Sequence, residues 1–391
     1  MNILVALNVD FDSKSGGLER SSVNLITYLS KEPSIQCVCA FNKFVDKIDT
    51  IVEVETTIKS AIDLKVLITT HKIDIILLPG GPWYSLLAAE AVVNTNCKII
   101  TAWHFSPGIA VGNTFQELRD SFKHSNNSLD TCKALFKLMV FPIYSLRQVN
   151  LDKKMFRDAY GATDCFVVLS ASYINKFKKL YSFSNVDKMR AISNSLSFDQ
   201  SITKEEILHK EKTILIVARF DESSKRLTYA LRIWKLLEAK NPDWKLQIVG
   251  DGKDRLLYEN LVAKLELKKV FFEGKQPSQS FYKKAAIFMM TSRHEGWGLT
   301  LTESQQMGCV PIAMDSFGSL HDIITNANNG FIIENNNLDA FAKQVQSLID
   351  NVILRQTIAW NAVQSSSRFS QDKIGKQWLE LFKKVHQGAI N

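Results

Sequence analysis

The stretch IFMMTSRHEGWGLTLTESQQMGCVPIAM, residues 287–314, decides the fold. It begins with one apolar run, Ile287–Thr291, and ends with another, Val310–Met314, and each predicts a buried strand. Between them lie a glycine-rich loop and a segment that predicts a helix from about Leu299. Two buried strands joined through a helix are typical of a parallel sheet with helices on its faces.

The same alternation of apolar runs and amphipathic segments forms two series along the chain. In the first series a helix is predicted over Leu18–Ser30, and the strands are Ile3–Leu7, Gln36–Phe41, Ile73–Leu78, Lys98–Ala102 and Cys165–Leu169. The second series adds three strands to the two above, which are Thr213–Arg219, Leu246–Gly250 and Val270–Phe272. Helices between and after these strands are predicted over Lys225–Ala239 and Ala340–Asp350.

Two successive series predict an α/β protein with two Rossmann-like, doubly wound domains, over residues 1–195 and 196–370. The join falls near the polar, turn-rich stretch Ile192–Gln200. Residues 371–391 are expected to form a helix that packs back toward the N-terminal domain. A ligand shared by both domains is expected in the cleft at the carboxyl ends of the strands.

The composition is that of a globular protein, with 46% hydrophobic and 23% charged residues among 391. Six scattered cysteines form no C-x-x-C pair, so we expect buried thiols in a reducing compartment. The first residues, MNILVALNVDF, lack the basic segment of a signal peptide. No apolar run reaches the roughly 18 residues that a spanning helix needs. We therefore expect a cytoplasmic protein, either free or peripheral on the inner face of the plasma membrane.

Residues 121–190 hold 12 basic against 5 acidic side chains, so this stretch carries +7 of the net charge of +8. Such a field can attract nucleic acid, anionic lipid or a phosphorylated substrate, or it can be a solvated face. Within it, TCKALFKLMVFPIYSL (131–146) interleaves apolar bulk with lysine. One interpretation is an amphipathic helix that lies on a bilayer, and the other is a core helix with lysines at its ends.

The loop that opens the helix at Leu299 has the residue types of a site for a phosphorylated sugar. Glycines before a helix N-terminus allow backbone N–H groups to approach a diphosphate. Glu295 in the loop can accept hydrogen bonds from sugar hydroxyls, and Glu303 can hold a ribose diol. After the strand Thr213–Arg219, an arginine and a lysine can clamp the diphosphate from two sides. We assign this lysine role to Lys225 in preference to its neighbour, Arg226.

Glu295 and Glu303 lie eight residues apart, in a Glu-x7-Glu spacing. This element resembles the hallmark of glycosyltransferase family 4, whose members have the GT-B fold and transfer sugars with retention. This chain departs from the family pattern with Trp297 for Phe, Ser304 for Ala, and Pro311 one residue later. The resemblance implies that Glu295 contacts the donor sugar and Glu303 the ribose, and that Arg219 and Lys225 contact the diphosphate.

The resemblance is dense over Lys212–Ile349, and weaker matches extend it more thinly over residues 1–200. SGGLER (15–20) resembles a G-G-x-E-R segment, and His104 follows a strand where the family often has a sugar-facing histidine. Gly250 resembles a G-x-G turn, Gly274-Lys275 a loop that meets the base, and Asn194 an interdomain asparagine. The implied catalytic residues are Glu295, Arg219, Lys225 and His104. The implied donor contacts are Gly16, Gly17, Gly250, Lys275, His294, Gly296, Trp297, Gly298, Leu299, Thr300 and Glu303.

The D-x-D of this sequence, Asp10-Phe11-Asp12, is interpreted as a pair of loop acids and not as a metal site. We therefore expect no metal or other cofactor, because cationic side chains and a helix N-terminus can stabilise the departing diphosphate. The missing G-x-G-x-x-G argues against a nicotinamide-dependent dehydrogenase. The basic stretch lacks a nucleic-acid reading motif, so we expect no nucleic-acid partner. A catalytically silent nucleotide-sugar-binding subunit is the other alternative.

The form of the motifs resembles bacterial enzymes of surface polysaccharide synthesis, such as lipopolysaccharide O-antigen or capsule. The resemblance implies transfer of a hexose or N-acetylhexosamine from a UDP-sugar, with a GDP-sugar as the alternative. It further implies a saccharide or polyprenyl-diphosphate-linked acceptor. The basic, apolar region 121–190 suits an acceptor of that kind, and suits a peripheral contact with an anionic membrane.

Overall fold

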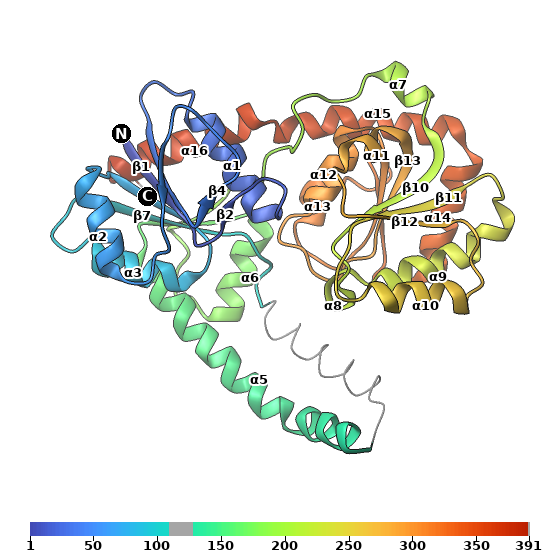
Figure 1. Ribbon diagram of the computed structural model, residues 1–391, viewed down its shortest axis with the longest axis horizontal. Helices are drawn as coiled ribbons and strands as arrows, with labels where there is room; N and C mark the ends of the chain where they lie inside the picture. The colour runs from blue at the N-terminus through green and yellow to red at the C-terminus, as the bar shows by residue number, and fades with distance from the viewer. Residues whose placement is uncertain (109–127, 390–391) are drawn as a thin grey trace. The chain divides into compact units, whose positions relative to one another are not determined.

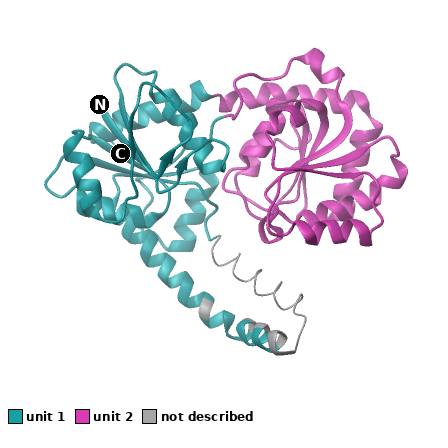
Figure 2. Cartoon of the chain, viewed as in Figure 1, with its two compact units in different colours: residues 1–195, 371–391 teal, residues 196–370 magenta. Residues whose placement is uncertain are grey.

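The computed structural model describes residues 1–108 and 128–389, in two compact units that Figure 2 colours separately. Unit 1 comprises Met1–Ser195 and Gln371–Asn391, and unit 2 comprises Leu196–Ser370. Each unit is a parallel sheet with helices on its faces, so the predicted α/β class is confirmed (Figure 1).

Unit 1 has a seven-stranded sheet within the described residues, in the order β5-β3-β1-β6-β7-β8-β9. All of its pairings are parallel. The strands are β1 (Asn2–Ala6), β3 (Gln36–Phe41), β5 (Val52–Glu55), β6 (Ile75–Pro79), β7 (Lys98–Trp103), β8 (Cys165–Val168) and β9 (Met189–Ala191). A separate short pair joins β2 (Asp10–Phe11) to β4 (Lys43–Phe44). Asp10 therefore lies in a strand and not in the predicted loop.

The central strands of this sheet alternate between two apolar layers. Val5 faces one core cluster together with α1 and α16, whereas Leu4 faces another with α2 and α3. Because both faces are covered, these strands are apolar on both sides, which is why the sequence shows continuous runs. The helices are α1 (Gly17–Leu29), α2 (Ala61–Thr70), α3 (Pro82–Ala91), α5 (Ser128–Ala162), α6 (Ala171–Tyr181) and α16 (Gln371–His386).

The C-terminal helix α16 belongs to the core of unit 1. Ile374, Trp378 and Phe382 join the apolar layer beside α1. Gly375 allows the close approach, since a Cβ there would lie 2.3 Å from the ring of Tyr28. The last segment of the chain thus completes the fold of the first unit.

Unit 2 has a six-stranded parallel sheet, in the order β12-β11-β10-β13-β14-β15. The strands are β10 (Glu211–Val217), β11 (Lys245–Val249), β12 (Val270–Gly274), β13 (Ala285–Met290), β14 (Val310–Met314) and β15 (Phe331–Ile333). The α-helices are α7 (Lys204–Leu208), α8 (Glu222–Lys225), α9 (Leu227–Leu237), α10 (Arg255–Lys264), α11 (Gln279–Lys284), α12 (Leu299–Gln306), α13 (Leu320–Ile323), α14 (Leu338–Asp350) and α15 (Val352–Ser366). Two short 3₁₀ turns follow α9 and α15, at Glu238–Lys240 and Ser367–Phe369.

The predicted helix Lys225–Ala239 is wrong at its start. Arg226 has left-handed backbone angles, φ 50° and ψ 46°, and separates the short α8 from α9. A left-handed residue ends one helical hydrogen-bond pattern before the next begins. The short edge strands β5, β9 and β15 were not predicted, because runs of three or four residues carry little periodicity.

Helix α5 contains the segment 131–146, and the two halves of the helix differ in burial. Its second half is part of unit 1, with Asp152, Phe156 and Ala159 buried, whereas most side chains over Cys132–Arg147 are exposed. Residues 121–127 of the basic stretch lie outside the described part. Cys132 is exposed, unlike the other five cysteines, which corrects the expectation that all six are buried. In the part of the chain that is described, no helix is both long and apolar enough to cross a bilayer.

Candidate functional site

The central contact of unit 2 joins Lys225 and Glu295. Lys225 ends α8 after strand β10, and Glu295 lies in the loop after β13. The ammonium Nζ of Lys225 is 2.6 Å from Oε1 of Glu295. Both side chains are mostly buried, 19% and 15% exposed, so the pair is less screened by water than a surface pair. The adjacent strands β10 and β13 bring together two charges that are 70 residues apart.

These two residues line a small pocket at the carboxyl ends of β10 and β13. Thr300 joins Lys225 and Glu295 in its wall, and its floor is apolar, from Ile216, Phe288 and Met289. Its empty volume is about 240 Å³, including open solvent. The carboxyl edge of a parallel sheet is where α/β proteins bind ligands. Of the predicted residues, the structure therefore brings Lys225, Glu295 and Thr300 together.

The loop that carries Glu295 is held by hydrogen bonds from neighbouring segments. The Ser319 hydroxyl donates to the carbonyls of Gly296 and Trp297, at 3.2 and 2.8 Å. The Ser316 hydroxyl donates to the Ser292 carbonyl at 2.6 Å. These serines were not predicted. The feature of the sequence that could have indicated them is the polar run DSFGS (315–319), which follows a buried strand. A braced loop holds Glu295 in place before a ligand arrives.

Helix α12 begins directly after this loop at Leu299. Gly298 precedes it with φ 104°, a backbone conformation that favours glycine. The first N–H groups of a helix, here those of Leu299 and Thr300, have no partner within the helix and point along its axis. Such a helix end attracts an anion. The geometry of Gly296–Thr300 therefore suits a phosphate, as the sequence predicts.

Glu303 lies one turn further along α12 and is 1% exposed. Its Oε1 accepts a 2.7 Å hydrogen bond from the Ser197 hydroxyl. Ser197 was not predicted, and only its place in the polar stretch at the domain join pointed to it. Because a buried carboxylate needs hydrogen-bond partners, Ser197 fixes the position of this side chain.

The neighbouring basic residues have different roles. Arg226 is buried and its guanidinium donates to the carbonyls of Thr291 and Ser292, at 2.8 and 2.9 Å. It therefore ties α8 to the end of β13 and leaves the site to Lys225. Arg219 is 73% exposed and lies 3.5 Å from the Asp221 carboxylate. It does not line the pocket of Lys225 and Glu295, which falls entirely within described residues.

Four other predicted donor residues do not line the pocket of this pair. Gly250 packs on backbone, since a Cβ there would lie 1.9 Å from the Ala218 carbonyl oxygen. Lys275 is exposed after β12. His294 is half-buried in the loop of Glu295. The Trp297 side chain is buried against Phe369, at 5.2 Å between ring centroids. Trp297 can therefore contact a ligand only through its backbone.

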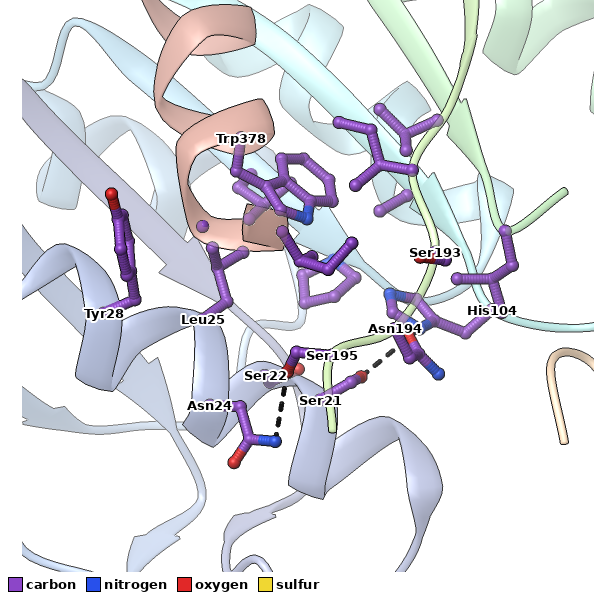
Figure 3. A pocket seen from close by; sticks show the side chains of 18 of the residues that line it. Ser21, Ser22, Asn24, Leu25, Tyr28, His104, Ser193, Asn194, Ser195 and Trp378 are labelled. Carbon is purple, nitrogen blue, oxygen red and sulfur yellow. Dashed lines mark hydrogen bonds between the residues drawn. The ribbon is translucent and has the colours of Figure 1, made fainter. Parts of the chain in front are cut away.

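Unit 1 has its own pocket, between α1, α16 and one face of the sheet (Figure 3). The end near His104 is polar, with Ser21, Asn194 and Ser195, whereas Trp378 lines the other end. The empty volume is about 570 Å³, including open solvent. Ser21 and Ser195 were not predicted. The signal was two consecutive serines, 21 and 22, which lie on the buried side of α1.

His104 follows strand β7 and contacts α1. Its Nδ1 lies 3.4 Å from the Ser21 hydroxyl. Burial lowers the pKa of His104 to about 4, because the charged imidazolium is disfavoured away from water. The ring is therefore neutral at physiological pH and can both donate and accept a hydrogen bond.

Gly16 and Gly17 stand at the start of α1. Gly16 is extended, and a Cβ there would lie 2.4 Å from the Glu19 carboxylate. Gly17 is exposed. Neither lines the pocket of His104. Among the residues that the structure describes, no group of three or more His, Cys, Asp or Glu side chains has the arrangement of a metal site.

Known proteins share sequence and fold with this chain. The family described as glycosyl transferases group 1 matches residues 197–365, which lie within unit 2. An uncharacterized glycosyltransferase of Haemophilus influenzae is 24% identical over 379 residues, covering 93% of this chain and 95% of that protein. The Anabaena protein Alr3699/HepE, solved in complex with UDP, superposes with a TM-score of 0.72 at 16% identity. That match covers 98% of this chain and all of the Anabaena chain.

This protein is a glycosyltransferase. The predicted GT-B architecture of two Rossmann-like domains is confirmed by its structural neighbours. A third relative of this glycosyltransferase is GalNAc-alpha-(1->4)-GalNAc-alpha-(1->3)-diNAcBac-PP-undecaprenol alpha-1,4-N-acetyl-D-galactosaminyltransferase of Campylobacter jejuni. It is 24% identical over 229 residues, which cover 59% of this chain and 62% of the relative.

Proposed function

We propose that this glycosyltransferase is a retaining enzyme of family 4 that transfers a hexose or N-acetylhexosamine from a UDP-sugar. The observation that carries the proposal is the mostly buried pair of Lys225 and Glu295 beside the N-terminus of α12. A diphosphate needs positive charge, and a sugar needs hydrogen-bond acceptors for its hydroxyls. This one pocket offers both.

Donor binding is proposed to separate the two charges. Lys225 turns to the diphosphate, and Glu295 accepts hydrogen bonds from the sugar hydroxyls. The N–H groups at the start of α12 meet the phosphates, and the exposed Arg219 adds a second cation. Glu303 holds the ribose diol from the position that Ser197 fixes. Lys275, in the loop after β12, is proposed to contact the base.

The chemistry proposed for this site is stabilisation of charge on the departing diphosphate. Lys225 and the helix N-terminus supply the positive charge, so the proposed reaction requires no metal ion. The acceptor oxygen attacks the anomeric carbon on the face that the diphosphate leaves, and a phosphate oxygen takes its proton. The C–O bond to the diphosphate breaks, and the new bond keeps the anomeric configuration. Glu295 positions the sugar and does not form a covalent bond.

The acceptor is proposed to be handled by unit 1. Neutral His104, with Ser21 and Asn194 beside it, offers hydrogen-bond partners without charge. A saccharide hydroxyl fits such a neutral polar site. The relatives include a glycosyltransferase named for amylovoran biosynthesis and one named for an undecaprenol-linked substrate, which supports a saccharide or lipid-linked acceptor in bacterial surface polysaccharide synthesis. Work on a lipid-linked acceptor would place the enzyme at the inner face of a membrane.

A panel of nucleotide sugars tests the proposal. A ligand at 100 times its dissociation constant stabilises the folded state by about 2.7 kcal/mol, so the true donor raises the melting temperature. We expect one UDP-sugar to do so and to be hydrolysed slowly in the presence of EDTA. The product anomer, read by NMR, is expected to match the donor. Inversion, or a strict requirement for a divalent cation, would contradict the mechanism, and binding without any turnover would favour a silent binding subunit.

A further inference from the structure

Helix α5 carries an exposed apolar face over its first half. The large side chains at Leu135, Phe136, Met139, Val140, Ile143 and Leu146 are exposed, with Met139 at 72% and Ile143 at 74%. They recur at intervals of three and four residues, which places them on one side of a helix. We call these six residues the α5 face. Figure 1 shows this half of α5 extending away from the sheet of unit 1.

The α5 face is larger than the scattered apolar residues of ordinary surfaces. Exposed apolar side chains are common singly, but a contiguous group of six marks a contact with another phase or molecule. The other half of the same helix packs normally, with Phe156 against Tyr181 at 4.3 Å between ring centroids. The contrast within one helix shows that its first half is not needed to complete the core of unit 1.

The charges on this half of the helix point to an anionic partner. Lys133, Lys137 and Arg147 are exposed among the α5 face residues. The sequence has no acidic residue between Asp130 and Asp152, so the stretch between them carries a net positive charge. An apolar side combined with exposed Lys and Arg matches the interface of an anionic bilayer, where apolar groups enter and cations meet headgroups. A helix interrupted by charge at these intervals lies on a bilayer and does not cross it.

We propose that the α5 face lies in the surface of an anionic lipid bilayer, with the helix axis parallel to the membrane plane. The inference narrows the membrane contact from the whole region 121–190 to one side of residues 132–147. Strands β8 and β9 are excluded, since Cys165, Phe166 and Met189 are buried in the sheet and its core. The inference rests on the proposed function in one respect, that a lipid-linked acceptor requires work at a membrane.

Vesicle flotation of the full chain tests the proposal. The probes are vesicles of phosphatidylcholine with or without phosphatidylglycerol. The test variant changes Met139→Gln and Ile143→Gln, and the matched control changes Leu256→Gln and Ile353→Gln, which are 67% and 78% exposed in unit 2. We expect the parent and the control to bind phosphatidylglycerol vesicles, and the test variant to bind at least about tenfold more weakly. A third variant, Lys137→Gln with Arg147→Gln, is expected to lose the salt-sensitive part of binding.

Cys132 gives a direct readout, because it is exposed, stands four residues before Phe136, and is the one exposed cysteine of the six. A polarity-sensitive fluorophore on Cys132 is expected to shift to the blue on phosphatidylglycerol vesicles. Equal flotation of the test variant and the parent would overturn the proposal. So would a parent that ignores vesicles but forms a dimer that the test variant abolishes, since the face would then be a self-association surface.

Sugar-nucleotide hydrolysis without vesicles separates this inference from the proposed function. The test variant is expected to hydrolyse the donor as the parent does, because the α5 face lies outside both pockets. A parent that binds vesicles but turns over no donor would contradict the proposed function and leave the α5 face assignment standing.

Discussion

The pockets of the two units differ in the charge they present. In unit 2, Lys225 and Glu295 form a mostly buried ion pair beside a helix N-terminus. In unit 1, the pocket of His104 is lined by hydroxyl, amide and apolar groups, and burial keeps the imidazole neutral. The difference supports the proposed division of labour, in which unit 2 handles the charged diphosphate and unit 1 handles neutral hydroxyls.

Removing the charges of unit 2 should have the largest effect on activity. We expect Lys225→Ala and Glu295→Gln each to lower sugar transfer by about 100-fold or more, the scale of losing one group that stabilises developing charge. Lys253→Ala is the control, because Lys253 is 61% exposed and lies 3.7 Å from Asp221. Steady-state transfer rates with matched melting temperatures check this. Near-normal turnover in both variants would contradict the role of the unit 2 charges in sugar transfer.

Gly250 of unit 2 tests whether a predicted donor residue is instead required by the fold. Gly250→Ala is expected to lower the free energy of unfolding by about 2 kcal/mol, because φ is 138° and the new Cβ would overlap the Ala218 carbonyl. Gly274→Ala is the matched control, with positive φ but nothing within 4 Å, and about 1 kcal/mol is expected. Denaturant unfolding measures both. If Gly250→Ala left the stability unchanged but lowered the affinity for the donor, Gly250 would have to be assigned to the donor site as the sequence predicted.

Ser197 tests how Glu303 is positioned. Ser197→Ala removes a hydrogen bond to a buried carboxylate, so we expect the donor KM to rise by up to about tenfold with kcat nearly unchanged. Ser197→Thr keeps the hydroxyl and is expected to restore KM. A purely structural role would instead lower the melting temperature of the alanine variant and leave its KM alone.

The pH dependence of His104 is the smallest expected effect. Its pKa is about 4 in the folded protein, against about 6.5 in an unfolded chain. As the pH falls from 6.5 to 4, the unfolded state takes up the proton first, so stability falls over this window. We expect the stability of the His104→Gln variant to fall less over this window. We also expect His104 to cause no inflection in the pH profile of wild-type activity between pH 6 and 8. An activity inflection near pH 6.5 that His104→Gln removes would show a charged ring and contradict the neutral character of unit 1.

Much of the fold could be predicted from the sequence, because parallel strands buried on both faces are continuous apolar runs, and Gln36–Phe41 and Val310–Met314 were predicted to the residue. The loop of Glu295 could be predicted from the sequence because its glycines and acidic residues stand close together at the start of one helix. The pair with Lys225 depended on strand adjacency, which spacing alone does not reveal. The structural role of Arg226, and the residues Ser197 and Ser319, were not predicted, because their hydrogen-bond partners are distant in the sequence. The exposure of the α5 face also needed the structure, because an amphipathic sequence does not tell which side is covered.

The most direct test of the charged site in unit 2 is a calorimetric titration of UDP into the full chain and into Lys225→Ala. UDP carries the diphosphate without the sugar, so it isolates the contribution of the cation. We predict that UDP binds the parent and that the Lys225→Ala variant binds it at least about tenfold more weakly, the loss of one charge-assisted hydrogen bond. Equal affinity in the two proteins, or no binding to the parent, would contradict the assignment.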